Sequence, residues 1–263
     1  AVKTYRRSLQ LASEHDKHVQ RVISHLYLGL AMLHHEMGNQ EAAAQFLQKS
    51  EELGKQNTLI DWPYRYCLAQ AQLKEAEGDL EAALDLLDEA KRVYARNPVP
   101  NVRPVEALKA RVYVRQGRLT NALDWVRDRG LSVDDDLSYL REFEHIVLVR
   151  VLIAEYKSNH AERAVLQAVG LLERLLKAAE DGKRMGSVIE ILALQALAYQ
   201  AQGNPLALAS LERALTLAEP EGYVRLFVDE GVAMAHLLSE TAVHGIMPDY
   251  TGKLLAAFPV AEP

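Results

Sequence analysis

The sequence has little cysteine, few aromatic residues and no long apolar run, and each shortage removes a class of protein. Its one cysteine, Cys67, cannot form an internal disulfide, and no cysteine spacing suggests a zinc site. We therefore expect a reducing, cytoplasmic setting. Only 6% of residues are aromatic, and strand-like alternation is absent. Even the apolar run at 146–154 is interrupted by Arg150, so we expect no contact with a membrane.

Positive charge is also scarce. The formal net charge is −6, and no segment holds five or six consecutive lysines or arginines. Because a domain that grips nucleic acid normally carries a basic face, we do not expect these residues to bind DNA themselves.

Helix-breaking residue pairs recur at regular intervals along the chain. Their spacings are 40, 39, 41 and 45 residues, and the pairs are Gly38–Asn39, Gly78–Asp79, Gly117–Arg118, Ser158–Asn159 and Gly203–Asn204. Glycine followed by a polar residue is typical of a helix end, because glycine adopts the left-handed conformation at low cost. The intervals predict a stacked array of helix pairs.

Alanines keep fixed positions around these turns. Those seven residues before the glycine are Ala31, Ala71, Ala110 and Ala196, and those four or five residues after it are Ala43, Ala83, Ala122 and Ala207. Small residues at fixed places let two antiparallel helices approach closely. The fourth unit departs, with Ser158 in place of glycine and extra residues that predict a longer second helix.

We expect an all-α chain of about 13 helices arranged as antiparallel pairs, an α-solenoid. The predicted ranges are 2–14, 17–37, 40–54, 62–77, 80–96, 103–116, 119–129, 137–157, 160–181, 185–202, 205–218, 222–240 and 249–257. Residues 1–221 would form the repeat array and residues 222–263 its C-terminal capping helices. We interpret Asp134–Asp136 as an N-cap cluster for the helix at 137–157.

Two longer stretches of sequence point to a more specific family than the repeat pattern alone. The first is NVRPVEALKARVYVRQG at 101–117, continued by RGLSVDDDLSYLREFE at 129–144, and the second is AEPEGYVRLFVDEG at 218–231, followed by GIMPDYTGKLLAAF at 245–258. The turn pattern resembles a tetratricopeptide repeat (TPR). The two stretches resemble the central helical region of the large ATP-dependent LuxR-type transcriptional regulators of the STAND class, over nearly the whole chain.

The resemblance implies a right-handed superhelix that senses an effector and couples it to self-association. The chain opens on Ala1–Val2 without methionine, so we expect it to be a piece of a longer protein. No G-x4-G-K-[S/T] loop occurs here. The family's ATP site and its helix-turn-helix are expected outside these residues, and no cofactor is expected within them. DNA would then be contacted only through a C-terminal domain beyond this chain.

The first helix of each pair normally lines the concave face of such an array, where a small-molecule effector or a regulatory protein would bind. Our candidate groove residues lie on those helices and are Tyr27, Tyr66, Arg103, Tyr113, Arg115, Tyr139 and Arg150. The alternative for each is packing against neighbouring hairpins. The same alternative is favoured for the cluster Trp62–Tyr66, whose aromatic rings fill space between hairpins or stack on a ligand.

Histidines and carboxylates suggest metal sites only weakly. Glu142 and His145 form one E-x-x-H pair without the second pair that a di-iron site needs, so an ion-pair or polar groove role is favoured for them. His15 with His18, and His34 with His35, fit helix ends better than metal binding. No nucleophile, base and acid occur together, so we expect no enzyme and no metal. The alternative function is a free-standing TPR scaffold that docks peptide segments of partner proteins.

Overall fold

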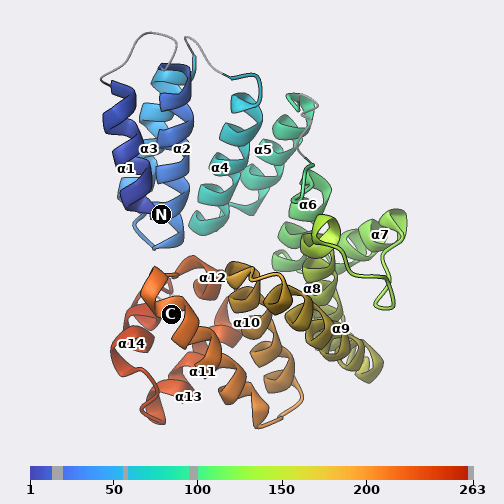
Figure 1. Ribbon diagram of the computed structural model, residues 1–263. Coiled ribbons are helices and arrows are strands. Elements are labelled where there is room, and N and C mark those ends of the chain that lie inside the picture. The colour runs from blue at the N-terminus through green and yellow to red at the C-terminus, as the bar shows by residue number, and fades with distance from the viewer. Residues whose placement is uncertain (14–19, 56–58, 95–99, 260–263) are drawn as a thin grey trace. The chain divides into compact units, whose positions relative to one another are not determined.

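The computed structural model describes residues 1–13, 20–55, 59–94 and 100–259 (Figure 1). Across these ranges every regular element is helical, with fourteen α-helices, two short 3-10 helices and no strand, which confirms the all-α prediction. The chain divides into two compact units, Ala1–Pro100 and Asn101–Pro263, and each is described by itself. The predicted division at residues 221 and 222 stays a prediction.

The first unit consists of five helices. These are α1 (Val2–Ser13), α2 (Gln20–Glu36), α3 (Gln40–Gly54), α4 (Trp62–Glu77) and α5 (Leu80–Arg92). Helix α2 packs against α3 and α4 against α5, while α1 lies along α2 (Figure 1). The two pairs meet where α4 contacts both α2 and α3.

The turns of this unit have the predicted chemistry. Gly38 and Gly78 have φ angles of 78° and 83°, in the left-handed region. After each glycine the next backbone N–H reaches back to the helix, from Asn39 to the carbonyl of His34 at 2.8 Å and from Asp79 to that of Lys74 at 3.0 Å. These bonds satisfy the last carbonyls of α2 and α4, so each helix stops at its glycine.

The predicted alanine positions are buried in both units. Those with no exposed surface are Ala31, Ala43, Ala71, Ala83, Ala110, Ala122 and Ala196, and Ala207 is 5% exposed. A methyl group at each position lets the two helices of a pair approach closely. The structure therefore confirms the helix-pair pattern and its TPR-like character.

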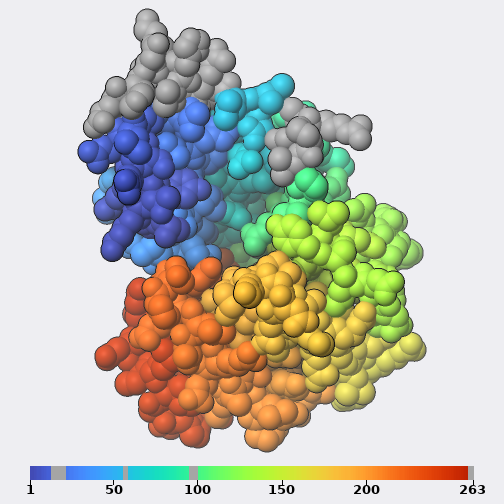
Figure 2. Space-filling view, viewed as in Figure 1, coloured from blue at the N-terminus to red at the C-terminus, as the bar shows by residue number. Residues whose placement is uncertain are grey.

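The second unit holds the remaining helices. They are α6 (Val105–Arg115), α7 (Leu119–Arg129), the 3-10 helix η1 (Tyr139–Arg141), α8 (Glu142–Asn159), α9 (Glu162–Asp181), α10 (Met185–Ala201), α11 (Leu206–Ala218), η2 (Glu219–Glu221), α12 (Arg225–Val228), α13 (Val232–Val243) and α14 (Pro248–Ala256). One apolar core runs from α8 to α14 and includes Leu172, Leu211 and Phe227, all without exposed surface. Helix α13 packs against α10 and α11, and side chains fill the spaces between the helix ribbons (Figure 2).

The fourth repeat differs from the others at its turn. Helix α8 continues through Ser158 to Asn159, and His160 takes the left-handed conformation with a φ of 54°. Helix α9 then runs for 20 residues, compared with 11 in α7. The predicted longer second helix is thus confirmed.

Two local predictions are wrong. The predicted helix at 222–240 is broken into α12 and α13, because Gly231 lies between them with φ 76° and ψ −156°, a conformation open essentially only to glycine. Helix α8 begins at Glu142, after a 3-10 turn, and has no side-chain cap, so Asp134–Asp136 do not cap it. Asp135 instead accepts a hydrogen bond from the backbone N–H of Ser132 at 3.2 Å.

Candidate functional site

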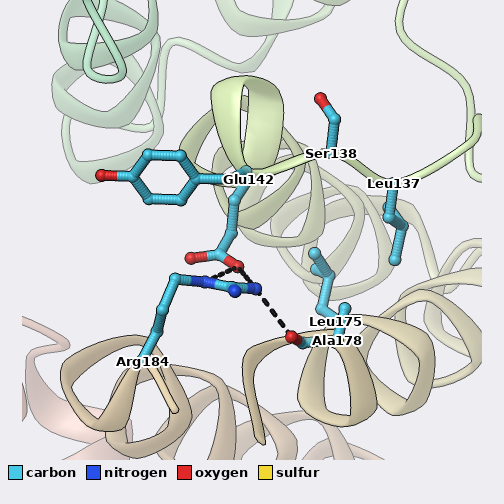
Figure 3. Close-up of a pocket in the computed structure, with 7 residues that line it drawn as sticks. Leu137, Ser138, Glu142, Leu175, Ala178 and Arg184 are labelled. Carbon is cyan, nitrogen blue, oxygen red and sulfur yellow. Dashed lines mark hydrogen bonds and ion pairs between the residues drawn. The ribbon is translucent and has the colours of Figure 1, made fainter. Parts of the chain in front are cut away.

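A pocket of about 190 Å³ opens beside the start of α8 (Figure 3). Its walls come from three segments of the second unit: the loop and 3-10 turn before α8, the second half of α9, and the turn between α9 and α10. The lining residues are Leu137, Ser138, Tyr139, Glu142, Leu175, Ala178 and Arg184.

The loop before α8 is held in place by a polar network. Arg174 of α9 donates to the backbone carbonyl of Asp135 at 2.6 Å and also to that of Val133. The Asp135 carboxylate lies 3.1 Å from Nε2 of His145, whose Nδ1 faces the carbonyl of Arg141 at 2.9 Å. The hydrogen bond from the Ser132 N–H, with the nearby His145 and Arg141, lowers the pKa of Asp135. This network fixes the loop that supplies one wall of the pocket.

An ion pair forms the polar wall of the pocket. Nε of Arg184 donates to Oε2 of Glu142 at 2.8 Å, and the hydroxyl of Ser187 donates to Oε1 at 2.6 Å. Arg184 also donates through Nη2 to the carbonyl of Ala178 at 2.8 Å. The hydrogen bond from Arg184 to Glu142 holds the pKa of this guanidinium above its ordinary value. The wall is therefore charged but paired.

The opposite wall is apolar. Figure 3 shows Leu137 and Leu175 on the side away from the Glu142–Arg184 pair, and the Ser138 hydroxyl points away from that pair. Tyr139 is 57% exposed, and the guanidinium of Arg184 lies 5.7 Å from the centre of its ring. A cation close to an aromatic face is favourable, and the exposed ring remains open to a further contact.

Tyr139 is the one candidate groove residue that lines this pocket, and it lies in η1 before the first helix of its pair. Arg150 lies elsewhere, deep in the second unit. Its guanidinium is 3.0 Å from Glu190 of α10 and 2.5 Å from Glu230, which follows α12. Burial alone would raise the pKa of Glu190, but the charges of Arg150, Arg103 and Arg111 together lower it. Arg150 therefore ties α8 to α10 and to the segment before α13.

The remaining candidates of the second unit lie apart from one another. Arg103 precedes α6, and its guanidinium lies 5.0 Å from the ring centre of Phe143. Arg118 lies over the ring of Tyr113 at 5.0 Å. Arg115 ends α6 and is partly buried. None of these residues lines the pocket of Figure 3.

The candidates of the first unit take part in aromatic packing. Tyr27 stacks on Phe46 at 6.1 Å between ring centres, and Tyr66 stacks on Trp62 at 4.7 Å. The indole N–H of Trp62 donates to the Ser50 hydroxyl at 3.0 Å. Trp62 is 7% exposed. The structure supports the packing interpretation of the cluster at 62–66, in which rings fill space between hairpins.

The two residues of the E-x-x-H pair have other partners in the structure, and the ring centre of His34 lies 5.2 Å from that of Phe46. Glu142 pairs with Arg184 and Ser187, and both ring nitrogens of His145 face oxygen atoms. His15 and His18 lie outside the described residues. Within the described ranges no group of three histidine, cysteine, aspartate or glutamate side chains is arranged to hold a metal ion.

Sequence reasoning missed five pocket residues, which are Leu137, Ser138, Leu175, Ala178 and Arg184. For Glu142 the favoured role was an ion pair or a polar groove, and the structure places it in an ion pair with Arg184. The signal available was the long α9 helix, which carries Leu175 and Ala178 to the level of the α8 start. None of the helices described here is long and apolar enough to cross a membrane.

Paired antiparallel helices with buried alanines where they meet define a class of protein, the TPR-like α-solenoid. Residues 1–244 match the family described as the MalT-like TPR region. This match covers most of the 263 residues, and the chain belongs to that family. No curated protein matches the chain.

Proposed function

We propose that this chain is the effector-sensing and coupling module of a LuxR-type transcription regulator, and that the pocket beside Tyr139 is its effector site. The observation that carries the proposal is the pocket itself. It joins an exposed aromatic ring, a paired polar wall and an apolar wall, which is the composition of a small-molecule site. The family match and the sequence resemblance support the regulatory role.

The position of the pocket suggests how sensing would be coupled to assembly. Its walls belong to the α8–α9 pair and to the turn that leads into α10. A ligand that contacts all three segments stabilises one arrangement of these helices over others, by its differential affinity for that arrangement. The proposed output is self-association of the regulator, with ATP hydrolysis and DNA binding carried out by other domains.

Isothermal titration calorimetry with candidate metabolites, a maltose-type sugar first, tests the sensing half. We expect one metabolite to bind the chain, and we expect Tyr139→Ala to weaken its binding at least fivefold, because the ring at the mouth is lost. Leu166→Ala is the matched control, since Leu166 is 62% exposed on α9 and does not line the pocket. Sedimentation velocity with and without that metabolite tests the coupling half.

Two results would overturn this assignment. Equal weakening by the Tyr139 and Leu166 variants would exclude the pocket as the effector site. Failure of every metabolite, together with tight binding of a regulatory protein or a peptide segment, would favour protein-controlled regulation or a TPR scaffold instead.

A further inference from the structure

The chemistry of the pocket restricts what it can hold. We propose that it binds a small uncharged molecule with a hydrogen-bond donor and acceptor on one edge, such as a carboxamide, and an apolar face on the other. This inference rests on the proposed function and specifies the class of effector.

The size of the pocket sets the first limit. Its volume of about 190 Å³ is below the roughly 300–1,000 Å³ of sites for drug-sized ligands. It therefore accommodates a single ring or a short branched chain, or the end group of a larger molecule.

The paired wall sets the second limit. Both oxygens of Glu142 accept hydrogen bonds, one from Arg184 and one from Ser187, and the two charges of the ion pair cancel. An anionic ligand would bring a negative charge to Glu142, and a cationic ligand would bring a positive charge to Arg184. Either would place an uncompensated charge in a partly buried site, which costs free energy. An uncharged ligand avoids this cost.

The same wall keeps unused hydrogen-bonding capacity. A guanidinium has five N–H donors, and within the described residues the Nη1 atom of Arg184 makes no hydrogen bond. A carboxylate oxygen can accept two hydrogen bonds, and Oε1 of Glu142 accepts one, from Ser187. The wall thus retains a donor and an acceptor in one ion pair. A carboxamide carries the complementary pair, a carbonyl oxygen and an N–H.

The apolar wall accounts for the other half of the ligand. Leu175 is 1% exposed and fixed in the core, and Leu137 also lines the pocket. Tyr139 adds an exposed aromatic face at the mouth. A flat apolar group placed between these side chains would lose its contact with water, which supplies most of the binding free energy of a small ligand.

Gly182 positions the guanidinium of Arg184. Its φ of −83° and ψ of 0° are open to any residue, so the backbone does not require glycine here. A Cβ at this position would overlap Nη1 of Arg184 and lie 2.8 Å from its Cζ. The absence of a side chain at Gly182 therefore leaves the space that the guanidinium occupies. Gly182→Ala is expected to displace Arg184 without removing it.

Three ring compounds of nearly the same size and shape test the proposal. Benzamide is neutral, benzoate is anionic and benzamidinium is cationic. In NMR titrations of the full chain, we expect benzamide to bind with a Kd on the order of 1–10 mM, as suits a fragment of this size. We expect benzoate and benzamidinium to bind at least tenfold more weakly. We expect the shifted signals to include Tyr139 and Arg184.

Two glycine variants supply matched controls. Gly182→Ala should weaken benzamide at least fivefold while the circular dichroism spectrum stays that of the folded wild type. Gly170→Ala, at an open position within α9, should leave binding unchanged. Benzoate or benzamidinium binding as tightly as benzamide would refute the neutral class. Unchanged binding in Gly182→Ala would refute the role of Arg184.

Failure of this inference is distinguishable from failure of the proposed function. If none of the three compounds binds, the carboxamide class is wrong. The effector assignment still stands in that case if calorimetry finds a metabolite whose binding depends on Tyr139.

Discussion

Arg150 offers the most informative perturbation of the array, because it is the shared partner of two carboxylates. The side chains of Arg150, Glu190 and Glu230 are 11%, 14% and 15% exposed. Arg150→Met keeps most of the side-chain volume and removes the charge. It leaves two buried carboxylates without their common cation. Breaking a buried ion pair from one side costs about 3–5 kcal/mol, and we expect a loss in this range.

The assay is urea unfolding followed by circular dichroism at 222 nm, compared across three proteins. The free energies of unfolding of the wild type and Arg150→Met should differ by the full cost of breaking the ion pairs. The triple variant Arg150→Met, Glu190→Gln, Glu230→Gln removes every charge of the cluster and should recover most of the loss, to within about 1–2 kcal/mol of wild type. Because repeat arrays unfold in more than one step, the transition assigned to the second unit is the one to compare.

The pH dependence gives an independent check with a defined sign. The folded pKa of Glu190 is lowered, so the stabilisation by this cluster is present at neutral pH and is lost as the pH falls through that pKa. In Arg150→Met the Glu190 carboxylate loses its nearest cation and takes up a proton at higher pH, so the stability deficit of this variant should shrink as the pH falls from 7 to 4. A loss below about 1 kcal/mol, or a triple variant as unstable as the single one, would refute the reasoning.

Two further predictions concern the first unit. Gly54→Ala should lower the free energy of unfolding by about 1–3 kcal/mol in thermal unfolding, because its Cβ would overlap the ring of Trp62. The control is Gly170→Ala on the open face of α9, which should be neutral or stabilising by up to about 1 kcal/mol. Equal effects of the two substitutions would contradict the overlap. Burial, and then the charge of Arg6, lower the pKa of His34, so the unfolded chain binds this proton at a higher pH than the folded chain. Stability should therefore fall as the pH drops below about 6.5 and level off below the folded pKa. His34→Leu should remove this part of the pH dependence. If the melting temperatures of the wild type and His34→Leu change in parallel between about pH 7.5 and 5, the role of His34 is disproved.

The helix-pair architecture could be predicted because its determinants are local. A glycine such as Gly78 ends a helix through its own backbone conformation, and an alanine such as Ala83 is small wherever the chain takes it. The helix break at Gly231 could not be predicted, because the apolar pattern around it continues without interruption. Its neighbours Val228 and Val232 continue an apolar pattern, and only the backbone conformation shows where the helix breaks.

The pocket could not be predicted because its parts meet through tertiary structure. Glu142 and Arg184 are 42 residues apart, and their pairing depends on the length of α9 and on the turn at Gly182. Tyr139 was selected for its residue type, and its contact with Arg184 could not be seen in the sequence. Arg150, a groove candidate by sequence, lies instead in an ion cluster with Glu190 and Glu230. These partners could not be foreseen because they lie 40 and 80 residues further along the chain.

The buried alanines have a consequence for how such an array can change. They set the approach of the helices with inward-facing methyl groups, and the charged and polar residues on the outer surface contribute little to that spacing. Substitutions on the exposed faces, and at the mouth of the pocket, can therefore accumulate without altering the frame. The proposed effector site can therefore change its residues while the helices around it keep their arrangement.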